Sequence, residues 1–163
     1  MPIRYSARSN LVETTYSAPG SSGWVDTHCH LFLANPTPEE LLSRAVSAGV
    51  EWVVIPGTNL ADSLTARSIS AAMPGRTKWS AGLHPHDAVY WLDQKDRISA
   101  LAADADAVGE CGLDYYRNLS PPEDQRRAFT DQLHLAAILS KPVIVHCRDA
   151  FRDVFDALEN FGS

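Results

Sequence analysis

The segment Trp52-Val53-Val54-Ile55-Pro56-Gly57 decides the fold class of this chain. A nearly continuous apolar run that ends in a turn is typical of a strand buried on both faces, as in parallel α/β sheets. Helical patterns lie on both sides of this segment. Thr37-Pro38-Glu39-Glu40 matches a capping box with proline in the first turn, so a helix begins there and ends near Gly49. A second helix is expected at about 61–73.

The same alternation continues along the chain in both directions. Further strands are predicted at 24–31, 78–83, 107–111 and 143–147, and further helices at about 93–103, at 121–140 after a capping box at Ser120-Pro121-Pro122-Glu123, and after Asp149. Repeated strand–helix units connect through right-handed crossovers and form a parallel sheet, which is either doubly wound or of the barrel type. Spacing alone does not choose between these two folds.

Composition indicates an ordinary soluble protein with one domain. The chain has 163 residues, of which 45% are hydrophobic and 21% are charged. No apolar run approaches the ~20 residues needed to span a bilayer, so no membrane partner is expected. Residues 1–22 lack the apolar block of a secretion signal, and we expect a flexible tail there, followed by a domain at 23–163. Three cysteines without an export signal predict reduced thiols and a cytoplasmic location.

The charge of the chain restricts how it could hold a nucleic acid. The formal net charge is −6, and the sequence has no basic cluster beyond Arg126-Arg127. Proteins that bind nucleic acid through backbone charge alone usually carry a basic patch. A phosphate substrate would therefore be held locally, by metal and a few nearby cations.

Metal-binding residue types gather where the predicted strands end. His28 and His30 alternate at the end of the first strand and so share one face, Glu110 ends the fourth strand, and His146 ends the fifth. Ligands of parallel α/β folds collect at the carboxyl ends of the strands. A buried ionised Glu needs a partner, and a metal ion is an adequate one. The sequence therefore predicts that His28, His30, Glu110 and His146 bind a divalent metal.

Cysteines directly follow three of these predicted ligands, at Cys29, Cys111 and Cys147. Neighbouring side chains on a strand point to opposite faces. We therefore expect the thiols to face the helix layer as small apolar fillers, which argues against a mixed Cys/His zinc site.

Other polar residues lie near the same strand ends. His84 and His86 close the third strand, and Arg148 lies one strand step beyond His146 on the same face. The residues alone leave Arg148 open between a phosphate contact and a salt bridge. They leave Asp114 open between holding a turn and giving a supporting hydrogen bond.

Four motifs in order resemble the TatD family of metal-dependent deoxyribonucleases, across roughly Trp24 to the C-terminus. They are Asp26-Thr27-His28-Cys29-His30-Leu31, Gly82-Leu83-His84-Pro85-His86, Gly109-Glu110-Cys111-Gly112-Leu113-Asp114-Tyr115-Tyr116 and Pro142-Val143-Ile144-Val145-His146-Cys147-Arg148-Asp149-Ala150. The resemblance implies a TIM barrel of the amidohydrolase type that hydrolyses DNA with one or two divalent ions. Mg, Mn and Zn all stay open, because sites of His and carboxylate accept several metals.

The resemblance also implies a role for each matching residue. By motif position, His28 and His30 would hold one ion, Glu110 would bridge, and His146 would hold the second ion. His84 and Arg148 would lie near the substrate phosphate.

The sequence departs from the family in its length. A complete barrel takes ~250 residues, so we expect a TIM-barrel type of α/β fold truncated to about five βα units. The family's later motifs, which supply another histidine ligand and a strand-end aspartate that activates water, do not follow. No catalytic residue is therefore assigned. Three interpretations stay open: part of a longer enzyme, a short product that self-associates through the exposed edges of its sheet, or a remnant without catalysis.

Two other functions stay open at this level. The same ligands could polarise a carbonyl group, which would make the protein an amidohydrolase acting on a small amide or ester. Alternatively, the incomplete barrel could be a metal-binding or interaction protein without turnover.

Overall fold

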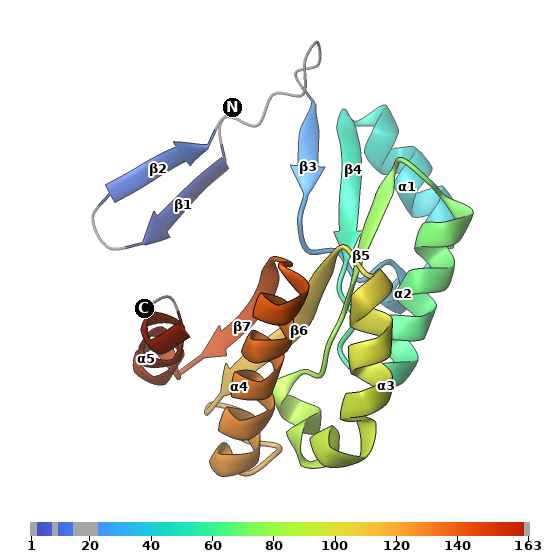
Figure 1. The fold of residues 1–163 in the computed structure, drawn as a ribbon. Coiled ribbons are helices and arrows are strands. Elements are labelled where there is room, and N and C mark those ends of the chain that lie inside the picture. Colours follow the sequence, from blue (N-terminus) through green and yellow to red (C-terminus); the bar gives the residue numbers. More distant parts are fainter. Residues whose placement is uncertain (1–2, 8–9, 15–22, 162–163) are drawn as a thin grey trace.

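The computed structural model of the chain describes residues 3–7, 10–14 and 23–161. Its main sheet has five parallel strands in the order β3-β4-β5-β6-β7, so each strand lies beside its neighbour in sequence, and the sheet curls into about half of a barrel (Figure 1). A doubly wound sheet would reverse its strand order part of the way through the chain. The observed order therefore shows a barrel-type sheet. The spacing of the predicted elements had left this fold and the doubly wound fold open.

Strands and helices alternate as predicted. The strands of the sheet are β3 (Trp24–Asp26), β4 (Val50–Ile55), β5 (Thr77–Ala81), β6 (Ala107–Asp114) and β7 (Val143–Arg148). The helices between and after them are α1 (Pro38–Ser47), α2 (Leu60–Ala72), α3 (Trp91–Asp104), α4 (Pro122–Leu139) and α5 (Phe151–Phe161). Two 3₁₀ helices, η1 (Leu31–Leu33) and η2 (Pro85–Tyr90), lie in the loops after β3 and β5.

Three strand boundaries near the candidate site differ from the prediction. The third strand was expected to reach Leu83 but ends at Ala81, so His84 and His86 lie beyond the sheet. The first strand was expected to reach Leu31 but ends at Asp26, so His28 and His30 lie in the loop before η1. The chain turns there because the carboxylate of Asp26 accepts a hydrogen bond from the backbone N–H of His28 at 3.0 Å. The fourth strand continues beyond Cys111, because β6 stays paired with β7 up to the end of both strands.

The two predicted capping boxes have different outcomes. At α1 the box is confirmed: the side chain of Thr37 accepts the N–H of Glu40 at 3.3 Å, and the carboxylate of Glu40 accepts the N–H of Thr37 at 3.2 Å. The box at Ser120 is wrong, because α4 has Pro121 at its N-cap and no capping side chain. Ser120 is buried, and its hydroxyl instead donates to the backbone carbonyl of His86 at 2.8 Å.

The three cysteines pack among apolar side chains, as predicted, and none forms a disulfide. Cys111 is fully buried with Phe129 and Leu133 of α4, and Cys147 packs against the same cluster. Cys29 packs against the cluster between the sheet and the first helices. Burial raises the pKa of the Cys29 thiol to about 11 and that of Cys111 still further, so both stay protonated at neutral pH.

The flexible tail predicted for residues 1–22 lies partly outside the described residues. Within the described part, β1 (Ile3–Ala7) and β2 (Asn10–Thr14) pair as antiparallel strands, with Ile3 opposite Thr14. The composition did not predict this hairpin. Among the described helices, none combines the length and the apolar character that a membrane crossing requires.

Candidate metal centre

Glycines bring β6 close to β7 on both sides of Glu110. Gly109 and Gly112 have φ angles of +123° and +146°, in a region that L side chains rarely adopt. A Cβ at Gly109 would lie 2.5 Å from the carbonyl oxygen of Ile144, and one at Gly112 would overlap the carbonyl oxygen of His146. Only glycine therefore allows the backbone approach that places Glu110 beside His146.

Gly112→Ala should lower the free energy of unfolding of the metal-free chain by about 3 kcal/mol, because backbone strain and steric overlap add. Urea denaturation measures this loss. Gly75→Ala is the matched control: its φ is +77°, but a Cβ there would meet no atom within 4 Å. The control should lose only about 1 kcal/mol, and an equal loss in both variants would contradict the steric argument.

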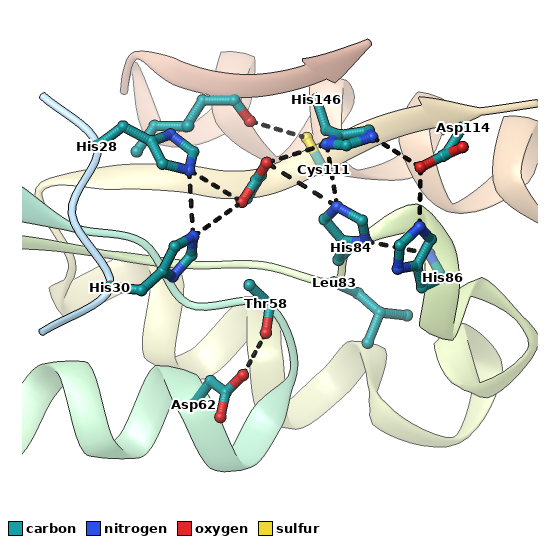
Figure 2. Close-up of polar contacts among 12 residues, drawn as sticks. His28, His30, Thr58, Asp62, Leu83, His84, His86, Cys111, Asp114 and His146 are labelled. Atoms are coloured by element: carbon teal, nitrogen blue, oxygen red, sulfur yellow. Dashed lines mark hydrogen bonds and ion pairs between the residues drawn. The ribbon is translucent and has the colours of Figure 1, made fainter. Parts of the chain in front are cut away.

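Glu110 is only 6% exposed and lies at the centre of a histidine cluster. The histidines of this cluster are labelled in Figure 2. Its Oε2 atom lies 3.2 Å from Nε2 of His28 and 3.6 Å from Nε2 of His30. Its Oε1 atom lies 3.2 Å from Nδ1 of His146 and 3.9 Å from Nε2 of His84. One carboxylate therefore faces two separate histidine groups, one with each oxygen.

The first group comes from the loop after β3. Nε2 of His28 and Nε2 of His30 lie 3.2 Å apart, and with the Glu110 carboxylate they place three donor atoms within 4.8 Å of one another. The N–H of Cys29, between the two histidines, ties the loop to β4 through the carbonyl of Val54 at 3.0 Å. Within the described part of the chain, the buried Nδ1 of His30 has no hydrogen-bond partner. Two imidazoles and a carboxylate that converge in this way fit a divalent cation.

The second group combines Glu110 with His84 and His146. The ring nitrogens and the carboxylate oxygen of this group also lie within 4.8 Å of one another. Nε2 of His146 lies 3.1 Å from Oδ2 of Asp114. A carboxylate at that position favours a proton on Nε2, which leaves Nδ1 of His146 free to bind a cation beside Glu110.

Asp114 has both of the roles that the sequence left open. It is 1% exposed, and its Oδ1 accepts the N–H of Arg117 at 2.7 Å, which holds the turn after β6. Its Oδ2 lies 2.8 Å from Nε2 of His86 and 3.1 Å from Nε2 of His146. Burial by itself would raise the pKa of Asp114, but hydrogen bonds from Arg117, His86 and His146 outweigh it and lower the pKa to about 2. Asp114 is therefore ionised and supports two imidazoles.

His84 carries no charge at neutral pH. Burial, together with the nearby His146, lowers the pKa of His84 to about 4, so the ring is neutral at pH 7. Its Nδ1 accepts the backbone N–H of His86 at 3.2 Å. The single ring proton must then be on Nε2, the atom that faces His146 and Glu110. His84 therefore presents a hydrogen-bond donor to the centre.

The histidines around Glu110 hold protons that a metal ion would have to displace. Burial by itself would raise the pKa of Glu110, but hydrogen bonds from His146, His28 and His30 bring it well below its usual range. Hydrogen bonds to Glu110 in turn raise the pKa of His28 and of His146. A cation that binds here must displace those protons, so its affinity should fall as the pH is lowered.

The structure brings the four predicted ligands and His84 together, but it places Arg148 elsewhere. The Arg148 side chain is exposed, and its guanidinium lies over the Tyr116 ring, 4.0 Å from the ring centroid. Beside the cluster is a cleft of about 360 Å³ lined by His30, Leu33, Thr58, His84, His86, Asp87, Glu110 and His146. Sequence reasoning missed Thr58, whose carbonyl accepts the N–H of His84 at 2.7 Å. Its position just after the second apolar strand was the available signal.

Comparison with known proteins gives consistent matches. The family model described as TatD related DNase matches residues 25–163. The 3'-5' ssDNA/RNA exonuclease TatD of Yersinia pseudotuberculosis is 47% identical over 122 residues, which cover 73% of this chain and 47% of the relative. The protein of the same name from Pectobacterium parmentieri is 47% identical over 115 residues, covering 69% and 44%. The chain thus spans about half the length of the curated relatives it matches.

Solved structures agree with the barrel-type fold. The crystal structure of a TatD homologue from Escherichia coli superimposes with a TM-score of 0.71 at 29% identity, over 85% of this chain and 56% of the other. An uncharacterised amidohydrolase from Saccharomyces cerevisiae gives a TM-score of 0.67 at 21% identity, over 85% of this chain and 51% of the other, which shows the fold alone.

Proposed function

Because the chain belongs to the family of TatD-related deoxyribonucleases, we propose that it carries the metal centre of a hydrolase that cleaves phosphodiester bonds in DNA. The observation that supports this most strongly is the position of Glu110, whose two oxygens face two histidine groups. The names of the curated relatives support a single-stranded nucleic acid, cleaved from its 3' end, as the substrate.

The proposed ligands are the four predicted from the sequence. His28 and His30 would hold one divalent ion with Oε2 of Glu110, and His146 would hold a second with Oε1. Magnesium, manganese and zinc all suit a site of imidazoles and carboxylate. When bound, such ions activate water and neutralise the charge that develops on the phosphoryl oxygens.

Other residues of the chain would orient the substrate. The Nε2–H of His84 faces the centre and would donate to a phosphate oxygen. Arg148 ends β7 at the same edge of the sheet, and its exposed guanidinium on Tyr116 would contact a phosphate farther along the strand. A site with donors and cations on several sides favours a phosphodiester over a small amide.

Two further properties belong to the same proposal. The three free cysteines are consistent with a reducing, cytoplasmic location. β3 and β7 are the edge strands of the five-stranded sheet in the described chain, so self-association would pair these edges with another copy.

The direct test is digestion of 5'-labelled single-stranded DNA and RNA by this chain with Mg²⁺, Mn²⁺ or Zn²⁺. We expect shortening from the 3' end, and a loss of about 100-fold or more on chelation, because a bound metal contributes several kcal/mol to such reactions. His28→Ala should behave like the chelated protein. His134→Ala is the matched control, since His134 is exposed on α4 and contacts Phe161 instead. A metal-loaded chain that leaves both strands intact contradicts the proposal.

A further inference from the structure

α4 carries two glutamines whose side chains are entirely buried. Gln125 and Gln132 are 0% exposed and lie seven residues apart, so they share one face of the helix. A buried amide without hydrogen bonds costs free energy. Both amides are bonded, and their partners lie next to the metal centre.

The two glutamines make the same set of hydrogen bonds. Oε1 of Gln132 accepts the N–H of Leu83 at 2.8 Å, while its Nε2 donates to the carbonyl of Leu83 at 3.1 Å. Oε1 of Gln125 accepts the N–H of Asp114 at 2.8 Å, while its Nε2 donates to the carbonyl of Asp114 at 3.2 Å. Each side chain therefore holds both backbone polar groups of one residue.

The residue held by Gln132 comes directly before His84. β5 pairs with β6 only as far as Ala81, so Leu83 lies beyond the backbone hydrogen bonds of the sheet. Figure 2 shows Leu83 below the ring of His84. Gln132 therefore supplies the two hydrogen bonds that a neighbouring strand would otherwise give to Leu83, at the point where the chain leaves the sheet.

The residue held by Gln125 is Asp114, whose carboxylate lies against His86 and His146. Nε2 of Gln125 also donates to the carbonyl of Ser120 at 2.7 Å, which closes the loop between β6 and α4. A shift of the Asp114 backbone would move the carboxylate that selects the tautomer of His146.

We propose that Gln125 and Gln132 are positioning residues of this centre. Gln132 keeps His84 as an Nε2–H donor, and Gln125 keeps Nδ1 of His146 available to a cation. The inference rests on the proposed metal site, but its effect on the imidazoles exists without metal.

The test compares Gln125→Met and Gln132→Met with Gln94→Met as the matched control. Gln94 of α3 also accepts a backbone N–H, that of Leu60 at 3.3 Å, but away from the histidine cluster. Long-range ¹H–¹⁵N spectra of the metal-free chain report the tautomer of each imidazole. We expect Gln132→Met to change His84 from one tautomer to a mixture, Gln125→Met to shift the ring ¹⁵N resonances of His146, and the control to change neither.

Titration with Mn²⁺ provides the second measurement. Gln125→Met should weaken binding at the His146 side about 10- to 100-fold, the usual effect of losing support for a ligand. Gln132→Met should leave metal affinity unchanged, because His84 is a donor and no ligand in this proposal.

Folded variants whose imidazole spectra match those of the wild type overturn the inference, whatever the metal does. If a Met variant does not fold, the Asn variant at that position replaces it, because its shorter amide cannot reach both backbone atoms. Changed imidazole spectra then support the inference, and unchanged spectra overturn it. A wild-type chain that binds no metal defeats the proposed function, while the imidazole spectra still decide the role of the glutamines.

Discussion

Glu110→Gln should abolish tight metal binding at both histidine groups in a single substitution. The two side chains have nearly the same shape, but the variant loses the negative charge and presents an amide N–H₂ to one group. Removing one partner of a buried charge interaction costs 3–5 kcal/mol, so each Kd for Mn²⁺ should rise about 100-fold or more. Calorimetric titration of the wild-type and variant chains measures both constants.

Asp62→Asn is the matched control for this change of acid to amide. Asp62 accepts hydrogen bonds from Thr58 and Asn59 near the cleft but belongs to neither donor group (Figure 2). Its substitution should leave both constants unchanged. If the Glu110 variant kept one ion at full affinity, the carboxylate would serve a single group, and the bridging role would be wrong.

Asp114→Asn should weaken only the His146 side. The new amide nitrogen would donate to Nε2 of His146, which moves the ring proton to Nδ1 and turns a ligand into a donor. Loss of such a carboxylate partner usually costs 10- to 100-fold in metal affinity. With the second site empty, the group of His28 and His30 should bind its ion as before, because Asp114 makes no contact there in the described structure.

The same variant should also change how stability depends on pH. The pKa of Asp114 is lowered from 3.8 to about 2 in the folded metal-free chain. Its ionised form therefore contributes about 2 kcal/mol above pH 4, a contribution that is lost as the pH falls toward 2. Urea denaturation across this range should show a loss about 2 kcal/mol larger in the wild type than in Asp114→Asn, because Glu110 contributes a further loss in both chains.

The order of elements and the residues that gather around Glu110 could be predicted from the sequence because each rests on local patterns. Apolar runs located the strands, and parallel strands always deliver their ends to one edge of the sheet. The prediction that His28 and His30 lie on the first strand is wrong, because they lie in the loop after it. Residues two positions apart point to the same side in a strand and in an extended loop alike, so the pattern does not distinguish the two. The ligand prediction did not depend on that difference.

Other features depend on contacts that no local pattern contains. Side-chain alternation put Arg148 on the face of His146, but it does not fix where a long, flexible side chain ends, and the guanidinium lies over Tyr116. Gln125 and Gln132 look like ordinary helix residues in the sequence. Their burial depends on the loops that α4 covers, which lie up to 49 positions away along the chain. The role of Ser120 was missed for the same reason.

In the proposed two-ion centre, the shared carboxylate would couple the two binding events. An ion held at the first histidine group would fix the orientation of Glu110 for the second group, yet would also add repulsion between like charges. Whichever effect is larger, thermodynamic reciprocity requires each ion to change the affinity of the other by the same factor. Where metal is scarce, that factor would decide how much of the protein carries one ion and how much carries two.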